Sequence, residues 1–291
     1  MFDGFEMSTI AVAGGSLRVR RGGVGPPVLL LHGHPQTHVM WHAVAPVLAE
    51  RHTVICADLT GYGGSSAPAT TADHEPYSKR AMGHVQIELM RELGFDRFAV
   101  VGHDRGGRVA YRMALDHPEV VQRLAVLDIV PTGEMWRHAG MEFGLAYWHW
   151  YFLAQPYDLP ERIITADPEA FYGSRWNAAS FHPDAVADYR QSIAAPGTVH
   201  AICEDYRAAA GIDREQDEID RRAERRIQCP VLVLWGREDG RLEQWFDVLD
   251  VWRRWAHDVQ GRGLPCGHHL AEELPEETAT ELTAFLQSSA T

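Results

Sequence analysis

Residues 98–108, FAVVGHDRGGR, constrain the fold of this chain more than any other segment. A short apolar run stops at Gly102, and residues that suit a helix follow at once. The pattern predicts a strand that turns sharply into a helix, with Asp104 at the apex. Gly102 and Gly106 flank this apex because a Cβ in so tight a turn would collide with neighbouring backbone.

A strand–turn–helix of this kind is the nucleophile elbow of the α/β-hydrolase fold, and most such elbows carry serine at the apex. An aspartate in that place attacks saturated carbon by displacement and forms an ester, which water must then open. Asp104 therefore predicts an enzyme that breaks a bond at saturated carbon.

Short apolar runs alternate with amphipathic stretches, which predicts a mostly parallel sheet flanked by helices. The expected strands are residues 8–12, 17–21, 27–31, 54–59, 97–101, 124–129 and 230–235, and helices are expected near 245–255 and 275–287. Residues 132–222 have helical periodicity and the aromatic cluster YWHWYF. We therefore expect an α/β-hydrolase core domain of residues 1–131 and 223–291, with an inserted helical cap domain of residues 132–222.

Composition excludes several classes of partner. A chain of 291 residues, 45% of them hydrophobic, can bury a large core. The net charge of −13 argues against nucleic acid and acidic membranes as partners, although local arginines can still hold a small anion. Four cysteines without CxxC spacing, no leader-like N-terminus and no apolar run near about 18 residues predict a cytoplasmic protein with no membrane partner.

An aspartyl nucleophile needs a base and an acid that orients the base, in the chain order nucleophile, acid, histidine. His268 in CGHHL is the expected base, ahead of its neighbour His269. Asp128 lies at the end of one expected strand and Asp239 follows the next, at the edge where open sheets hold their sites. We favour Asp128 as the acid and leave Asp239 open.

The loop HGHP at residues 32–35 closes an expected strand. In this fold the backbone N–H of His34 and that of Arg105 are expected to form the oxyanion hole. His32 and His34 could also suggest a metal site. No third ligand is evident and the carboxylate mechanism needs none, so we predict neither a metal nor a cofactor.

Arg105 and Arg108 lie at i and i+3 beside the nucleophile, so they share a helix face. Guanidinium groups hold carboxylates in a bidentate fork, which predicts a small anionic substrate; a surface salt-bridge pair is the alternative. His149 and the indole of Trp150 could donate hydrogen bonds to a departing halide. The other aromatic residues of the cluster are expected to pack on the core.

At these positions the chain resembles the haloacetate (fluoroacetate) dehalogenases of the α/β-hydrolase superfamily. The resemblance is carried by HGHPQT, DLxGYG, GHDRGGR, LDIxPT, YWHW, CEDYRA and the late GH, of which HDRGGR and YWHW together are specific. It implies hydrolysis of short 2-haloacids such as fluoroacetate or chloroacetate to the hydroxy acid and halide, and a possible homodimer. It implies Asp104 as nucleophile, Asp128 and His268 as acid and base, Arg105 and Arg108 on the substrate carboxylate, and His149 and Trp150 on the halide.

Two positions depart from the family pattern. Fluoroacetate-active members carry a third halide donor, a tyrosine, which we expect shortly after the DYRA segment, where this chain has Gly211. His34 stands where an apolar aromatic residue can occur. These departures leave the preferred halide open.

Two other functions are compatible with parts of the pattern. An epoxide hydrolase uses the same core with paired cap tyrosines, for which Tyr147, Tyr151 and Tyr206 are candidates, but it gives the two arginines no evident purpose. A ligand-binding protein that has lost catalysis would not be expected to retain the aspartate, histidine and acid. Halide release from chloro- and fluoroacetate, together with turnover of an epoxide such as styrene oxide, separates the three.

Overall fold

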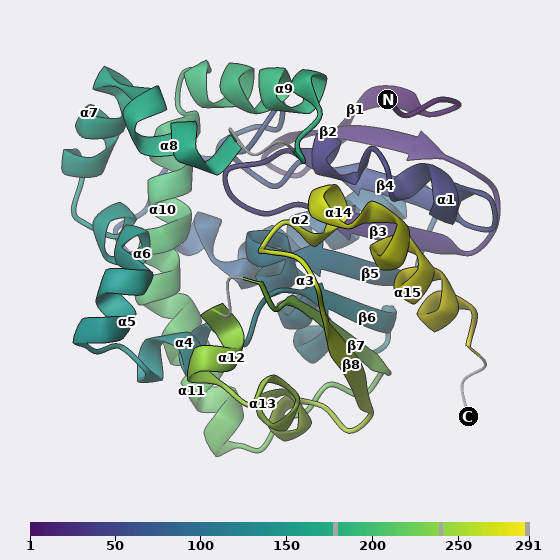
Figure 1. Ribbon diagram of the computed structural model, residues 1–291. Coiled ribbons are helices and arrows are strands. Elements are labelled where there is room, and N and C mark those ends of the chain that lie inside the picture. The colour runs from purple at the N-terminus through teal and green to yellow at the C-terminus, as the bar shows by residue number, and fades with distance from the viewer. Residues whose placement is uncertain (177–179, 239–240, 289–291) are drawn as a thin grey trace.

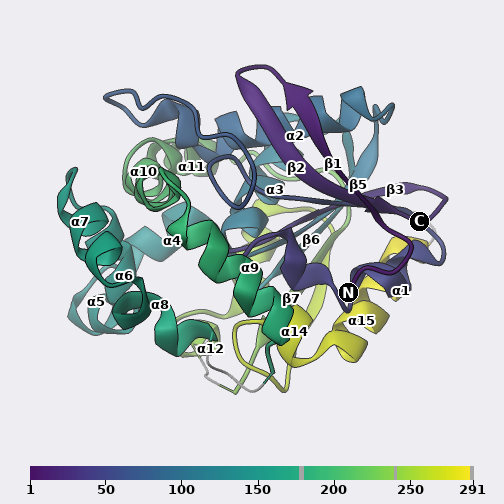
Figure 2. The ribbon, with the colours of Figure 1, turned by 90° about the horizontal axis from the view of Figure 1, so that it is seen from above.

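The computed structural model describes residues 1–176, 180–238 and 241–288. In these residues the strands form one sheet in the order β1-β2-β4-β3-β5-β6-β7-β8, with helices on both faces (Figures 1 and 2). The strands are β1 (Glu6–Val12), β2 (Gly15–Gly22), β3 (Pro27–Leu31), β4 (Thr53–Ala57), β5 (Phe98–His103), β6 (Val121–Leu127), β7 (Val231–Gly236) and β8 (Val259–Leu264). β2 pairs antiparallel with β1 and β4, and the remaining pairs are parallel. The predicted fold class is confirmed.

Every strand expected from the sequence is present, within a few residues of its predicted bounds. Residues of β3, β4, β5 and β7 are almost all buried, which is why these strands read as continuous apolar runs. The sequence analysis missed β8, whose sequence VQGRGL has two glycines, an arginine and a half-exposed pattern. As an edge strand it is half open to solvent, so it lacks the apolar run of the central strands.

The core helices pack against the two faces of the sheet (Figure 2). They are α1 (Ala45–Ala49), α2 (Lys79–Glu92), α3 (Asp104–Asp116), α12 (Arg241–Trp245), α13 (Val248–Trp255), α14 (Leu270–Glu273) and α15 (Pro275–Gln287). α3 begins at Asp104, the predicted nucleophile, and contacts both β5 and β6. It therefore fixes the elbow against the centre of the sheet.

Between β6 and β7 the described residues form helices alone. These are α4 (Thr132–Arg137), α5 (Met141–Ala146), α6 (Trp148–Leu153), α7 (Leu159–Ala166), α8 (Pro168–Trp176), α9 (Pro183–Ala194), α10 (Thr198–Ala210) and α11 (Ile212–Arg222). In Figure 1 they lie along the left side, beside one end of the sheet. They fall within the predicted cap of residues 132–222, and we call α4 to α11 the cap helices, or the cap, for their place in the chain. The division into two domains stays a prediction.

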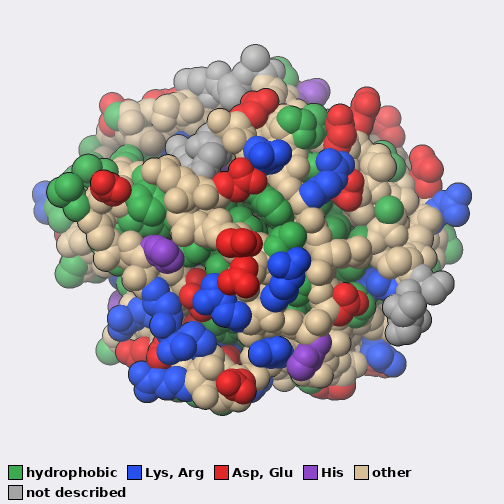
Figure 3. All heavy atoms as spheres, turned by 60° about the horizontal axis from the view of Figure 1, so that its bottom comes forward, with side chains coloured by type: hydrophobic (Ala, Val, Ile, Leu, Met, Phe, Trp, Pro, Cys, Tyr) green, Lys and Arg blue, Asp and Glu red, His purple; other side chains and the backbone are tan. Residues whose placement is uncertain are grey.

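Charges of both signs are mixed on the face that carries α11 and α13 (Figure 3). Glu218 accepts from Arg221 at 2.9 Å and from Arg222 at 2.6 Å, and it also pairs with Arg137. Such exposed pairs contribute little to stability, but they break up any large field of one sign. Among the described residues no helix is both long and apolar enough to cross a membrane.

A buried carboxyl group joins the loop after β3 to the cap and to the C-terminal helices. Glu272 of α14 accepts a hydrogen bond from the hydroxyl of Tyr189 in α9 at 2.9 Å and another from the side-chain amide of Gln36. Glu272 is 5% exposed, and burial raises the pKa of its carboxyl to about 8 although both hydrogen bonds oppose the shift. The folded protein therefore holds this group protonated at neutral pH.

Glu272→Gln is expected to remove a pH-dependent cost of folding. The unfolded carboxyl ionises near its ordinary pKa and the folded one only near 8, so stability is lost as the pH rises between these values. Relative to wild type, the glutamine variant should gain about 3 kcal/mol between pH 5 and pH 8. Urea unfolding at both pH values measures this, with the exposed Glu277→Gln as the control that shows no such trend. A stability difference that does not change with pH would contradict the prediction.

Candidate active site

The turn from β5 to α3 places Asp104 at the head of the helix. Asp104 has φ of 43°, in the left-handed region that a residue with a side chain rarely adopts. A Cβ on Gly102 would lie 2.4 Å from the carbonyl oxygen of Gly106, and one on Gly106 would lie 2.4 Å from that of His32. The two glycines are therefore required by close backbone contacts, as the sequence predicts.

The Asp104 carboxylate is buried, with 8% of the residue exposed, yet it is surrounded by groups that favour its charge. Its Oδ1 accepts the backbone N–H of His34 at 3.0 Å. Burial opposes ionisation of this carboxyl, but His268, His103, Arg105 and Arg108 outweigh burial and hold its pKa well below the ordinary range. Asp104 is thus an ionised, largely desolvated carboxylate, as a nucleophile requires.

His268 joins the two carboxylates of the predicted triad. Its Nδ1 lies 2.5 Å from Oδ2 of Asp128, and its Nε2 lies 3.9 Å from Oδ2 of Asp104. The backbone N–H of Gly236 donates to the other Asp128 oxygen at 3.0 Å, so the acid is fixed on both sides. Asp239, the other candidate acid, lies outside the described residues.

His103 and His269 lie beside the base. His103 Nε2 contacts the carbonyl oxygen of His268 at 2.8 Å and so fixes the backbone of the loop that carries the base. His269 is the neighbour that the sequence left less favoured, and burial lowers its pKa. One ring nitrogen from each of these three histidines can be chosen so that all lie within 4.8 Å of one another. His268 already serves two carboxylates, so a metal there would compete with the triad.

The other histidine pair of the sequence analysis is also committed to the protein. His32 Nε2 accepts the backbone N–H of Leu59 at 3.0 Å, while Nδ1 lies 2.9 Å from the carbonyl oxygen of Gly33. These bonds use both ring nitrogens of His32 to fix the loop. The residues present do not favour a metal at the His32-x-His34 pair.

Arg105 is fully buried and bound to the cap. Its Nε and Nη2 donate to the Asp205 carboxylate of α10 at 2.8 and 2.5 Å, and Nη2 also donates to the Asp205 carbonyl at 2.8 Å. Asp205 in turn accepts the hydroxyl of Tyr62 at 2.7 Å and pairs with Lys79. The sequence analysis quoted Asp205 within a motif but gave it no role; its position at i+100 from Arg105 carries no local signal.

Arg108 has no acidic ion-pair partner among the described residues. It donates to the carbonyl oxygen of Val130 at 3.0 Å and to the hydroxyl of Thr132 at 3.3 Å, and its guanidinium lies 4.6 Å from the ring centre of Trp150. Nη1 of Arg105 and Nε of Arg108 are buried with no hydrogen-bond partner among the described residues. Because buried donors are almost always paired, these two orphaned N–H groups mark a place for an anion.

Aromatic residues of the cap close over these arginines. The Tyr206 ring lies 4.1 Å from the Arg105 guanidinium, and its centre is 6.1 Å from that of His149 and 5.9 Å from that of Trp150. All three residues are at least 90% buried. The structure thus brings the two predicted halide donors, His149 and Trp150, together above Arg105 and adds Tyr206 to them.

The expectation for Gly211 needs correction. Gly211 follows the end of α10 and lines a cavity together with His200, Glu204 and Arg207. Tyr206 and Asp205 lie on another face of the helix, toward Asp104. The tyrosine that lies beside His149 and Trp150 is Tyr206, within DYRA, because helical geometry, not distance along the chain, decides which face a residue occupies.

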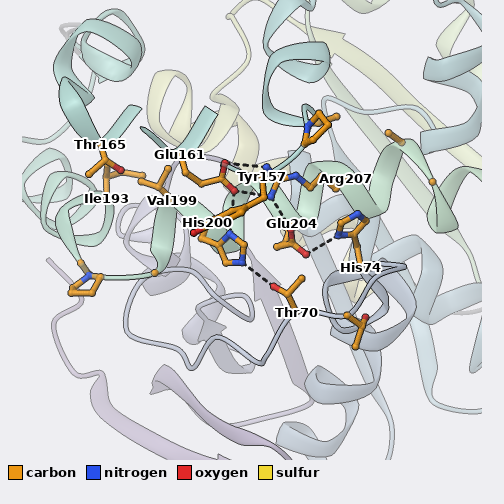
Figure 4. A pocket seen from close by; sticks show the side chains of 18 of the residues that line it. Thr70, His74, Tyr157, Glu161, Thr165, Ile193, Val199, His200, Glu204 and Arg207 are labelled. Atoms are coloured by element: carbon orange, nitrogen blue, oxygen red, sulfur yellow. Dashed lines mark hydrogen bonds and ion pairs between the residues drawn. The ribbon is translucent and has the colours of Figure 1, made fainter. Parts of the chain in front are cut away.

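The cavity that Gly211 lines has a volume of about 1410 Å³ and contains no triad residue (Figure 4). Arg207 bridges Glu161 and Glu204 at 2.7 Å each, while His74 and His200 pair with these same carboxylates. Its charged groups thus satisfy one another. We place the chemistry at the buried site around Asp104.

Comparison with known proteins agrees with this geometry. The family model described as alpha/beta hydrolase fold matches residues 26–273. The chain belongs to the alpha/beta hydrolase family. This hydrolase is 46% identical over 99% of its length, and 96% of the relative, to a fluoroacetate dehalogenase from Burkholderia sp. It is 33% identical to a soluble epoxide hydrolase from Corynebacterium sp. (strain C12), over 91% of its own length and 92% of the relative. A crystal structure of a putative alpha/beta hydrolase from Nostoc sp PCC 7120 superimposes with a TM-score of 0.96 at 50% identity, covering 99% of this chain and all of the other.

Asp205→Asn is expected to destabilise the protein by about 3–5 kcal/mol, because it leaves Arg105 and Lys79 buried without their shared carboxylate. Glu281→Gln is the matched control. It removes an acid from an ion pair with Arg262 whose side chains are 27% and 55% exposed, and it should cost less than about 1 kcal/mol. Urea unfolding of both variants tests this, and equal losses would show that the Asp205 cluster is not a buried charge network.

Proposed function

We propose that this hydrolase is a haloacetate dehalogenase that converts short 2-haloacids, such as fluoroacetate or chloroacetate, to the hydroxy acid and halide. The observation that carries the proposal is the pair of orphaned arginine N–H groups beside an ionised aspartate. A carboxylate held by both guanidinium groups presents its α-carbon to Asp104. The name of the Burkholderia relative supports the same substrate class.

In the first step a carboxylate oxygen of Asp104 forms a bond to the α-carbon of the haloacid. The carbon–halogen bond breaks on the opposite side, and its electron pair leaves with the halide. Nucleophile and substrate are both anions, so their approach costs energy unless cations lie close by. Arg105 is largely neutralised by Asp205, so Arg108 supplies most of the free positive charge.

In the second step His268 removes a proton from water, and the hydroxide adds to the carboxyl carbon of the Asp104 ester. The backbone N–H of His34, already 3.0 Å from Oδ1, and that of Arg105 stabilise the oxyanion. Asp128 stabilises the imidazolium, which then gives its proton to the departing hydroxy acid. The oxygen of the water remains in the Asp104 carboxyl group, which releases the second water proton to solvent and so returns to the carboxylate.

We assign the departing halide to His149, Trp150 and Tyr206. Fluoride leaves saturated carbon poorly, so donors must be placed where its charge develops. These three side chains offer an imidazole, an indole N–H and a hydroxyl from two cap helices, α6 and α10. The arrangement supplies more donors than chloride release requires, which favours activity on fluoroacetate as well.

Two substitutions separate the two half-reactions. Asp104→Asn should lower halide release by at least about 1,000-fold, because an amide is a poor nucleophile. His268→Asn should release one halide per site and then stop, because the ester forms but is not hydrolysed. A halide burst with the matching mass increase on Asp104 tests this.

A single turnover of wild type in ¹⁸O-water should also label Asp104, and an unlabelled carboxylate would exclude the ester pathway.

Epoxide hydrolysis is the second candidate, since the Corynebacterium relative is named for it and Tyr206 and Tyr172 lie near the site. If the arginine pair binds the substrate carboxylate, kcat/KM for chloroacetate should be at least about 100-fold higher than for chloroacetamide, because the neutral amide cannot form the charged fork. Rates on both compounds and on styrene oxide decide the matter. Turnover of styrene oxide without halide release from either haloacetate would replace the dehalogenase by an epoxide hydrolase.

A further inference from the structure

His34 has a buried side chain that the proposed mechanism leaves unused. Its backbone N–H binds Asp104, while its imidazole lies between two tyrosine hydroxyls. Nδ1 is 3.3 Å from the hydroxyl of Tyr206, and Nε2 is 3.2 Å from that of Tyr172. His34 is 3% exposed, and Tyr172 and Tyr206 are 0% and 1% exposed.

The imidazole is neutral in this place. Burial lowers its pKa well below the ordinary value, and the cations Arg175 and Arg105 lower it further. A neutral imidazole carries one N–H, so one ring nitrogen donates and the other accepts. The two tyrosines must therefore play opposite parts toward His34.

The two arrangements differ in which tyrosine keeps an unpaired hydroxyl proton. If Tyr206 donated to Nδ1, then Nε2–H would donate to Tyr172, and the Tyr172 proton would need another acceptor. The Tyr172 hydroxyl has no hydrogen-bond partner besides His34 among the described residues, and its ring lies against Phe171 and Trp176. An orphaned buried hydroxyl proton costs about 1–3 kcal/mol.

In the opposite arrangement Tyr172 donates to Nε2, and Nδ1–H donates to the oxygen of Tyr206. The one proton left over is then that of Tyr206, whose ring adjoins His149, Trp150 and Arg105. There it can meet a halide. With a halide bound there, every donor of the chain Tyr172–His34–Tyr206 is used, whereas the first arrangement leaves the Tyr172 proton unpaired even then.

We propose that His34 is a positioning residue that receives a hydrogen bond from Tyr172 and directs the hydroxyl proton of Tyr206 at the leaving halide. This inference rests on the proposed dehalogenase function and adds a determinant of its leaving-group preference. Each hydrogen bond in the chain polarises the next, so the Tyr206 hydroxyl becomes a stronger donor. A phenylalanine at this position would fill similar space without ordering the tyrosine.

Fluoride depends on hydrogen bonds more than chloride does, because its charge is more concentrated and its bond to carbon is harder to break. His34→Phe is therefore expected to lower single-turnover release of fluoride from fluoroacetate about tenfold, a part of the cost of losing a whole donor. Chloride release from chloroacetate should fall less than about threefold. A structural defect around Asp104 would lower both rates alike, so the ratio of the two rates is the informative quantity.

Tyr172→Phe provides a second test that leaves the oxyanion loop untouched. It should lower the fluoride-to-chloride ratio in the same direction, and the double variant should be no worse than His34→Phe alone, because both changes break one chain. Tyr77→Phe is the matched control. It removes a hydroxyl that donates to the carbonyl oxygen of Pro68, and it should leave the ratio unchanged.

The outcomes are distinct. A wild type that releases neither halide overturns both the proposed dehalogenase function and the proposed role of the chain Tyr172–His34–Tyr206. A wild type that releases both halides, with an unchanged fluoride-to-chloride ratio in His34→Phe and Tyr172→Phe, overturns only the proposed role of the chain Tyr172–His34–Tyr206. A ratio that rises in His34→Phe would show that the imidazole accepts the Tyr206 proton and withholds it from the halide.

Discussion

The rest of the site depends on one constraint, a carboxylate that must stay ionised while it is almost buried. A buried carboxylate normally recovers a proton, because desolvation disfavours its charge. Asp104 escapes this through the histidines around it, two arginines, the N–H of His34 and its place at the start of α3. The elbow holds the backbone of Asp104 in the strained left-handed region, and this conformation places the carboxylate next to all of these groups.

Gathering cations at this point creates a second problem, since cations are costly to bury as well. The chain solves it unequally for its two arginines. Arg105 receives a full carboxylate partner from the cap, whereas Arg108 receives only a carbonyl, a hydroxyl and the face of an indole. In the proposed mechanism Arg105 is the well-anchored guanidinium that orients the substrate carboxylate, and Arg108 is the poorly neutralised one that attracts it. Desolvation lowers the pKa of Arg108.

These features differ in how far the sequence reveals them. The elbow, the strands and the nucleophile–acid–base order are local signals, in which glycines and apolar runs lie next to the residue they position. Asp205 and Tyr206 are different, because they act only after α10 has folded back onto α3 and presents one face to it. Counting positions along the chain led to Gly211, which lines a cavity distinct from the site that Tyr206 faces. The sequence could not indicate the role proposed for His34 either, because Tyr172 and Tyr206 are 138 and 172 residues away along the chain.

The division of labour between core and cap has a consequence for how such a site changes. Asp104, Arg105 and Arg108 all lie on α3, so the nucleophile and the carboxylate fork are fixed to one rigid helix of the core. His149, Trp150, Tyr206 and Tyr172 belong instead to the helices α6, α10 and α8, which lie outside the rigid helix that carries Asp104. A substitution among the cap residues can therefore alter which leaving group is stabilised without moving the attacking oxygen. His34 is the exception, because its backbone N–H binds Asp104 while its imidazole contacts Tyr172 and Tyr206 of the cap helices. In the proposed mechanism this double attachment makes position 34 the place where a single residue couples the reaction to the leaving-group preference.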